Sequence, residues 1–267
     1  MQATRESRKT MNNIDTQIEL WRHREYIVSK SNTLIQNSRF NLSVQEQKAI
    51  AYILSLIKPN TQIIEYEFSI IHFLNVLGLT HSGKNYKDMK KVLKGLVSNV
   101  IWITLPNGTE TTINWLSKVY ITKQSGTCKI ILDTDMLPYL LNLREKFLSY
   151  HLYNILCLSS KYSIRLYEIL KSYLYIKTKI FKIDELKELL MLGSSSSSKS
   201  YSEFKVFNRN ILTKSISEIN DITDIYIEYT TIKQIRSVVA IEFKIRKKAN
   251  NEQMITFSKL EKILDNK

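Results

Sequence analysis

The sequence predicts an α+β protein that contains two tandem copies of one domain. Its 267 residues suffice for two domains of about 130 residues each. Hydrophobic residues make up 43% and charged residues 24%, a globular balance that excludes wholesale disorder. A shift of 115 residues places Tyr52 on Tyr167, Leu74 on Leu189 and Lys84 on Lys199. Because this period is far longer than solenoid repeats, we interpret it as an internal duplication.

The second copy predicts the order helix, strand, helix, helix, strand, strand. Ser159 and Ser160 are caps for the first helix, Asp184 caps the second, and Gly193 ends it. Periodicity predicts a helix over 161–175, a strand over 179–183, a helix over 184–192, a flexible turn over 194–200, a helix over about 202–220, and strands over 225–232 and 237–245. This is the order of a winged helix, in which a helix-turn-helix is followed by a β-hairpin wing.

The first copy follows the same order with additional strands. Ser43 caps its first helix, and Asp133 or Thr134 caps a final helix that leads to the second copy. The turn Pro106–Asn107–Gly108 is a strong hairpin signal. We expect helices over 44–57, 71–78, 86–98 and 135–143, and strands over 63–70, 100–106, 111–122 and 128–132. The predicted division is a polar arm over 1–25, winged-helix domains over 26–143 and 144–249, and a tail over 250–267.

The net charge of +14 points to a polyanionic partner such as nucleic acid. The excess is spread along the chain, with 17 basic and 11 acidic residues in 1–143 and 22 and 14 in 144–267. No apolar run reaches the roughly 18 residues that a membrane span needs. The polar start has no apolar segment typical of a signal peptide. We expect the two cysteines, Cys128 and Cys157, to be reduced thiols of a cytoplasmic protein.

Several segments resemble the plasmid replication initiator (Rep) family. The segments that carry the resemblance are SKSNTLIQNSRFNLSVQEQKAIAYILSLI, LPYLLNLREKFLSYHLYNILCLSSKYSIRLYEILKSY, FKVFNRNILTKSISEINDITDIYIEY and IEFKIRKK. The chain is similar to the two-winged-helix, RepB-type initiators of iteron plasmids over about residues 26–248. The resemblance implies binding to repeated sites at a plasmid origin, opening of an AT-rich segment and recruitment of host replication proteins. It also implies dimers that bind an inverted repeat and repress the initiator gene.

The third helix of the second copy is the first candidate DNA-binding element. Phe204, Phe207 and Ile211 are predicted to share its inner face. Lys205, Arg209 and Thr213 lie on roughly the opposite side, with Asn210 at the edge of that group. Arginine binds guanine bidentately and asparagine pairs with adenine in the major groove, so we expect Arg209 and Asn210 to read bases. The alternative is a solvated helix face.

Basic residues elsewhere are candidates for phosphate contacts. The third helix of the first copy carries five lysines and few side chains that read bases. We therefore expect it to contact phosphates and position the protein on the duplex rather than to read the base sequence. Lys233 and Arg236 lie at the predicted wing tip, where a polar turn is the alternative. For the helix lysines the alternative is a charged surface helix without a DNA contact, and for the basic end of the last strand it is a solubilising strand end. These remaining candidates are Lys84, Lys87, Lys90, Lys91, Lys94, Lys199, Arg246 and Lys247.

Patterns typical of enzymes fail on inspection. Residues 78–85 resemble a P-loop, but Asn85 lacks the hydroxyl that holds magnesium, and a helix precedes the loop where a strand is required. His23, His72, His81 and His151 form no H-x-H pair or other metal spacing. We therefore expect no catalytic residue, metal or cofactor. The alternatives are a winged-helix transcriptional repressor without a replication role and an origin-nicking enzyme.

The additional strands of the first copy suggest self-association. An extra strand around Asn114–Gln124 offers an exposed sheet edge, which is a ready pairing surface. We expect a homodimer, formed through the first domain, in equilibrium with monomer. A two-fold dimer presents its DNA-reading elements in opposite senses, so dimers match inverted repeats and monomers match direct repeats.

Overall fold

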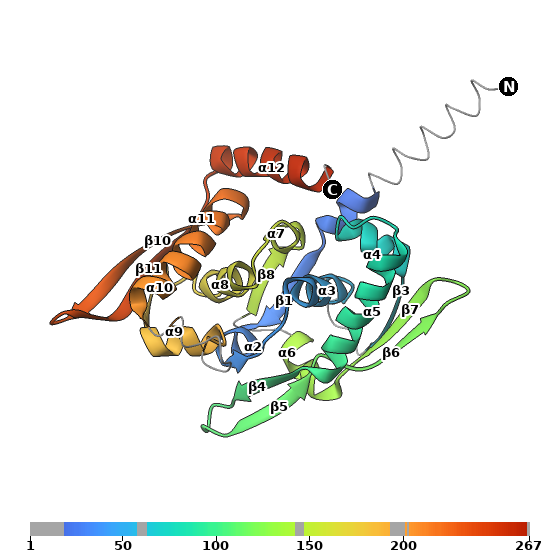
Figure 1. Ribbon diagram of the computed structural model, residues 1–267, viewed down its shortest axis with the longest axis horizontal. Coiled ribbons are helices and arrows are strands. Elements are labelled where there is room, and N and C mark those ends of the chain that lie inside the picture. The colour runs from blue at the N-terminus through green and yellow to red at the C-terminus, as the bar shows by residue number, and fades with distance from the viewer. Residues whose placement is uncertain (1–18, 58–62, 142–146, 193–200, 202, 266–267) are drawn as a thin grey trace.

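The computed structural model describes residues 19–57, 63–141, 147–192, 201 and 203–265 (Figure 1). The helices and strands of a first winged helix lie within these ranges. Its third strand, β7, pairs with both β3 and β6, all antiparallel. A capping box between Ser43 and Glu46 starts the first helix. Tyr52 is fully buried against Phe68 and Phe73 in the core. The elements are α3 (Val44–Ser55), β3 (Glu65–Ser69), α4 (Ile70–Val76), α5 (Gly83–Ser98), β6 (Leu116–Thr122) and β7 (Thr127–Leu132).

The second winged helix repeats this topology. Its last strand, β11, pairs with both β10 and β9, as β7 does with β6 and β3. The elements are α8 (Lys161–Lys171), β9 (Thr178–Lys182), α9 (Ile183–Leu189), α10 (Phe204–Phe207), η3 (Asn208–Leu212), α11 (Thr213–Ile222), β10 (Ile225–Gln234) and β11 (Ser237–Lys247). The predicted α+β class with two winged helices is confirmed. Gly193, the serine run 194–200 with Lys199, and most of the arm 1–25 lie outside the described residues.

The offset between the two copies varies along the chain. Helix α8 begins 117 residues after α3, whereas β9 begins 113 residues after β3. The constant shift of 115 residues therefore marks the repeat without matching every structurally equivalent residue. Tyr52 and Tyr167 are both fully buried in the first helix of their domains.

The predicted strand over 111–122 is wrong as a single element, because it divides at Trp115. Residues before the break form β5 (Glu110–Asn114), which pairs with β4 (Val100–Thr104); β4 also pairs with β2 (Ser38–Arg39). Residues after the break form β6, in a different sheet. Trp115 is buried and contacts Phe40 edge to face, with ring centroids 5.5 Å apart. The hairpin at Pro106–Gly108 is thus an insertion, and the wing is β6–β7.

Other boundaries also differ from the prediction. Asp184 lies inside α9, which begins after Lys182, so it is not the cap. Asp133, rather than Thr134, caps the 3-10 turn η1 (Thr134–Met136), which leads into α6 (Leu137–Leu140). The predicted C-terminal tail contains α12 (Asn250–Asp265), whose Leu260 and Leu264 are buried.

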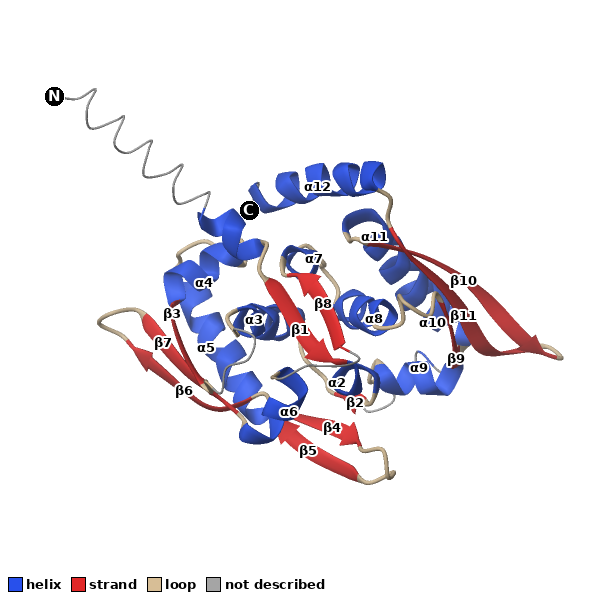
Figure 2. Cartoon of the chain, turned by 180° about the vertical axis from the view of Figure 1, so that it is seen from behind, coloured by secondary structure: helices blue, strands red, loops and turns tan. Residues whose placement is uncertain are grey.

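A two-stranded ribbon lies between the winged helices (Figure 2). It pairs β1 (Ile27–Ser31) with β8 (Phe147–His151), and α2 (Asn32–Gln36) and α7 (Tyr153–Leu156) follow its strands. Lys30 of β1 forms a buried ion pair with Glu168 of α8 at 2.6 Å. Tyr150 of β8 donates a hydrogen bond to the same carboxylate at 2.5 Å. The ribbon therefore joins both ends of the first domain to the first helix of the second.

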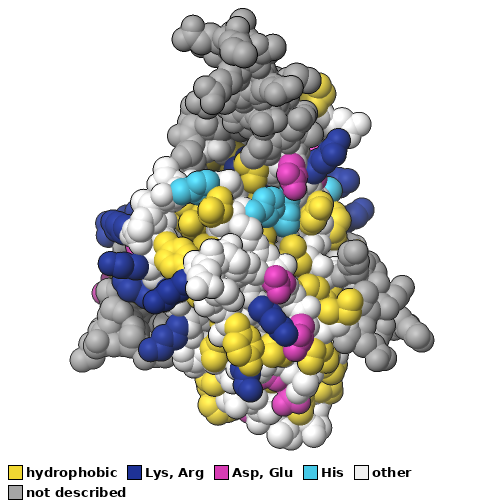
Figure 3. Space-filling model, turned by 90° about the vertical axis from the view of Figure 1, so that its right-hand side faces the viewer, with side chains coloured by type: hydrophobic (Ala, Val, Ile, Leu, Met, Phe, Trp, Pro, Cys, Tyr) yellow, Lys and Arg dark blue, Asp and Glu magenta, His cyan; other side chains and the backbone are white. Residues whose placement is uncertain are grey.

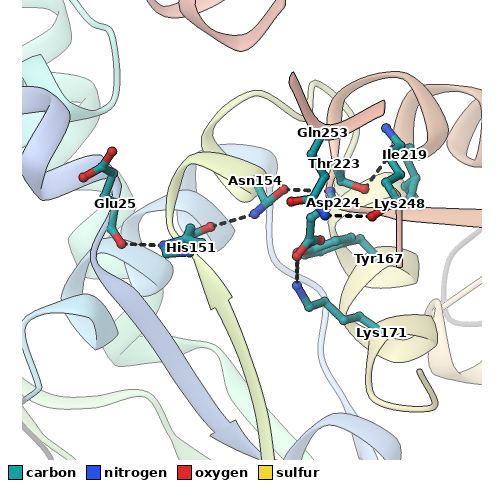
Figure 4. A network of polar contacts seen from close by, with 10 residues as sticks. All are labelled: Glu25, His151, Asn154, Tyr167, Lys171, Ile219, Thr223, Asp224, Lys248 and Gln253. Atoms are coloured by element: carbon teal, nitrogen blue, oxygen red, sulfur yellow. Dashed lines mark hydrogen bonds and ion pairs between the residues drawn. The ribbon is translucent and has the colours of Figure 1, made fainter. Parts of the chain in front are cut away.

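A polar network extends this joint toward the second wing (Figure 4). The His151 ring donates to the backbone carbonyl of Glu25 at 2.6 Å, and Asn154 donates to the carbonyl of His151 at 3.3 Å. Asn154 accepts from the backbone N–H of Asp224, whose carboxylate accepts from the Tyr167 hydroxyl at 2.9 Å. Asp224 directly precedes β10, so the network fixes the start of the wing. In the described part of the chain, no helix has the length and apolar character to cross a membrane.

Candidate nucleic-acid interface

The third helical segment of the second domain buries one side and exposes the other. Phe207 and Ile211 are buried, as their spacing predicts, and Phe204 packs against the core. Lys205 and Arg209 are exposed on the outer side. The segment therefore has the layout of a recognition helix, with an apolar face on its own domain and cationic donors toward solvent.

This segment is not a regular α-helix. Its middle turn, η3, is a π turn in which the backbone N–H of Thr213 donates to the carbonyl of Asn208, five residues earlier. Tyr229 of β10 holds the turn from the wing side. Its hydroxyl donates to Asn208 Oδ1 at 2.8 Å and lies 3.2 Å from Thr213 Oγ1. A single phenol thus clamps the helix to the wing.

The π turn changes which residues face outward together. Thr213 was predicted beside Arg209, but its hydroxyl contacts Tyr229. Lys214 follows Arg209 by five residues and is exposed, so it lies over Arg209 across the wide turn. Asn210 is half-buried and accepts a 3.3 Å hydrogen bond from Arg209 Nε. The outward basic line is therefore Lys205, Arg209 and Lys214. Helical spacing of 3.6 residues missed Lys214, because no sequence signal announced the π turn.

The wing of the second domain carries the other predicted cations. Lys233 and Arg236 are exposed at its tip, and Lys247 is exposed at the end of β11. Arg246 differs, because it forms a bidentate ion pair with Glu252 at 2.7 and 2.8 Å. That pairing and the backbone N–H of Ala249 lower the pKa of Glu252 to about 2. This pair occupies two of the five N–H donors of the Arg246 guanidinium, so a phosphate contact by Arg246 has to use the remaining donors.

The lysines of the first domain lie along the outer side of α5. The inner side buries Met89, Leu93 and Leu96. At about 100° per residue, four of the five lysines fall within one stripe. The space-filling view facing this end of the molecule shows Lys and Arg side chains gathered along one edge (Figure 3). The stripe consists of Lys84, Lys87, Lys91 and Lys94, and Lys90 lies beside it with its ammonium 5.0 Å from the Tyr86 ring centroid.

A groove of about 480 Å³ runs between α5 and β6. Lys90 and Lys94 line it from the helix, and Lys118 and Tyr120 line it from the strand. Two exposed lysines were not selected from the sequence. Lys118 lies within β6, and Lys123 lies at the tip between β6 and β7. The sequence predicted additional strands over 111–122 and 128–132 but did not identify β6 and β7 as the wing, so their lysines were not considered. The first domain therefore presents basic residues from both its third helix and its wing.

The enzyme-like patterns occupy ordinary structural positions. Residues 78–82 lie in the connection between α4 and α5, and residues 83–85 form the first turn of α5, which Ser82 caps by accepting from the backbone N–H of Asn85. Within the described ranges, no group of three His, Cys, Asp or Glu side chains is arranged to hold a metal ion.

Two family models match most of the chain. The model for "Initiator Replication protein, WH1" matches residues 27–171, and that for "Initiator Rep protein, WH2" matches residues 182–245. The chain belongs to the initiator Rep protein family. The predicted resemblance is thus confirmed, and this Rep protein carries the two winged-helix domains of a replication initiator. The first matched range runs past the predicted boundary at residue 143 and includes both strands of the ribbon.

Individual relatives of this Rep protein are distant. A curated "Replication initiation protein" from Escherichia coli is 27% identical over 208 residues, which are 73% of this chain and 62% of that protein. The chain therefore spans less than two thirds of the length of that relative. A crystal structure of RctB domains 2–3 matches with a TM-score of 0.44 at 12% identity, covering 82% of this chain and 88% of that one. A selenomethionine structure of the same domains gives a TM-score of 0.42 at 11% identity, covering 78% and 85%.

Proposed function

We propose that this Rep protein initiates plasmid replication by binding repeated sites at the origin, and that it breaks and forms no covalent bond. The observation that supports the proposal is the outward basic line Lys205, Arg209 and Lys214 on a third helix clamped to its wing. An α-helix fits the major groove, and cationic donors on its outer face suit base edges there. Membership of the initiator family makes an origin the expected DNA target.

The two domains divide the work in this proposal. The stripe on α5 and the groove beside β6 present lysines, which neutralise phosphates and set the position on the duplex. Arg209, with a planar fork of donors, reads bases in the second domain. Tandem domains can occupy successive major grooves about 34 Å apart, and linked contacts multiply affinity through effective concentration. Copies bound to repeats then deform the neighbouring AT-rich duplex, where host replication proteins are recruited.

Self-association through the first domain is the basis we propose for repression of the initiator gene. Strand β6 forms one edge of the sheet β3-β7-β6, and its Tyr120 is 51% exposed. A charge on an edge strand opposes pairing with a second edge. We expect Tyr120→Lys to reduce dimerisation of the full chain in sedimentation, whereas Tyr175→Lys on the second domain, where Tyr175 is 68% exposed, leaves it unchanged. If Tyr120→Lys dimerised as strongly as Tyr175→Lys, the result would contradict the proposal that β6 pairs with the same strand of a second copy.

The test of the proposed function is replication in trans. A plasmid that carries its origin but lacks the initiator gene should replicate only when this Rep protein is supplied, and footprinting should show protection at regularly spaced direct repeats. The alternative is a winged-helix repressor, which would protect its operator without supporting replication. A covalent protein–DNA adduct with a metal requirement would instead indicate an origin-nicking enzyme.

A further inference from the structure

The tip of the second wing presents an apolar side chain where its surroundings favour a polar one. Ile235 is 95% exposed and lies between Gln234 and Arg236 in the turn that joins β10 to β11. Its backbone φ is +58°, in the left-handed region that β-branched residues strongly disfavour. Both features oppose folding, since the side chain gains no burial and the backbone is strained. A strained, exposed residue of this kind indicates a function in binding another molecule rather than in stabilising the fold.

The other two long hairpins of this protein provide an internal comparison. The β4–β5 turn places Gly108 at φ +82°, and the β6–β7 turn places Gly126 at φ +66°. Both use glycine, which adopts positive φ without a steric penalty. The tip between β6 and β7 otherwise carries Lys123, Gln124 and Ser125, all polar. Only the second wing, among these three hairpins, has an apolar residue at the left-handed position.

The charge around Ile235 suits close approach to phosphates. Residues 231–241 contain Lys233 and Arg236 and no Asp or Glu. The carboxylates of this hairpin, Glu228 and Glu242, lie nearer the body of the domain. A register shift between Ile232 and Lys233 adds a bulge, which increases the twist of the distal strands. The tip is thus an apolar point flanked by two cations.

The length of the wing places this point one groove away from the recognition helix. Tyr229 contacts the helix at Asn208, and Ile235 follows Tyr229 by six residues. Six residues of extended strand span about 20 Å. The centre of the adjacent minor groove lies about half a helical turn, or roughly 17 Å, from a major-groove contact. The hairpin projects well beyond the domain, so its tip is free to reach that distance (Figure 1).

We propose that Ile235 is a wedge that enters the minor groove of bound DNA and partly unstacks one base step. Lys233 and Arg236 bind the phosphates on either side of the groove and hold the side chain in place. Apolar side chains inserted in this way kink a duplex toward the major groove. Pyrimidine–purine steps unstack most readily, so they are the expected position of the wedge. The inference rests on the proposed function, because it requires binding to an origin repeat.

The test places a fluorescent adenine analogue, 2-aminopurine, in a duplex that carries one direct repeat of the plasmid origin. The analogue is placed about five base pairs, half a turn, from the centre of the major-groove footprint. Its fluorescence rises when the neighbouring base unstacks. We expect a rise with the unchanged protein and with Ile235→Leu, and loss of the rise with Ile235→Gly. Glycine relieves the strained turn, so this variant should fold and should bind the repeat with at most about a tenfold loss of affinity.

Two results would contradict the proposal that Ile235 enters the base stack. Equal fluorescence with the unchanged protein and Ile235→Gly, at equal occupancy, would show that the side chain does not enter the stack. A change in sedimentation of Ile235→Gly without a change in fluorescence would assign Ile235 to a contact between protein copies. Gln124→Gly, at the tip of the first wing, is the matched control and should leave the fluorescence rise intact. Failure of the unchanged protein to bind the repeat would overturn the proposed function as well.

Discussion

Tyr229→Phe removes one oxygen atom and should separate the stability of the second domain from its DNA specificity. The hydroxyl donates to Asn208 at 2.8 Å and lies 3.2 Å from Thr213. A hydrogen bond contributes about 1 kcal/mol net, and Tyr229 and Asn208 are half-buried, so water replaces part of the loss. We therefore expect the free energy of unfolding to fall by about 1–2 kcal/mol in urea denaturation.

The effect on DNA recognition should be more selective than the effect on folding. Without the clamp, the π turn can return to regular α spacing, which would rotate Lys214 by about 100° relative to Arg209. The outward basic line would then lose its fixed geometry. We expect affinity for the origin repeat to fall by about 1–3 kcal/mol, the value of one bidentate base contact, with non-specific affinity unchanged.

The assay is a filter-binding titration of an origin repeat and of a scrambled duplex at the same salt concentration. Tyr226→Phe is the matched control, since Tyr226 lies on the opposite face of the same strand, with its ring 4.4 Å from Arg246 Cζ. An unchanged ratio of specific to non-specific affinity for Tyr229→Phe would refute the reasoning that the clamp orients the reading side chains.

Three further predictions concern other parts of the molecule. Lys87→Ala on α5 should weaken binding to all duplexes alike and lower the slope of log affinity against log salt by about one unit; a sequence-selective loss would show that α5 reads bases. Glu168→Gln leaves the buried Lys30 without its counter-charge, so urea unfolding should show a loss of about 3–5 kcal/mol, which Lys30→Met combined with Glu168→Leu and Tyr150→Phe should largely restore. Burial and the neighbouring His72 lower the pKa of His23 to about 4. Because the unfolded chain takes up this proton near pH 6.5, stability should fall as pH falls from 6.5 toward 4, and His23→Phe should flatten that part of a Tm-against-pH curve.

Local patterns predicted the elements that each domain builds from its own residues. The caps Ser43 and Ser160 and the apolar spacing of Phe207 and Ile211 depend on neighbours within a few positions, and the structure contains them. The ribbon was not predicted, because β1 and β8 are short and meet only after the first domain has folded between them. The division at Trp115 also escaped prediction, because the alternating pattern continues through it and burial against Phe40 sets the break.

The candidate interface was predicted in outline and missed in detail. Net charge and helix faces selected Arg209 and the lysines of α5, and the structure leaves all of them exposed except Lys90, which is half-buried. The partners of Thr213 and Arg246 depend on tertiary contacts with Tyr229 and with Glu252 of α12, and neither contact has a sequence signature. The π turn that Tyr229 holds also places Lys214 on the same side of the helix as Arg209.

The central claim is that the third helix of the second domain reads base edges, and Arg209→Ala tests it most directly. The measurement is the ratio of affinities for the origin repeat and a scrambled duplex at fixed salt, with Arg236→Ala at the wing tip as the matched loss of one cation. The account predicts that Arg209→Ala weakens binding to the repeat by about 1–3 kcal/mol and lowers the ratio, whereas Arg236→Ala weakens both duplexes alike. An unchanged ratio for Arg209→Ala would contradict the account.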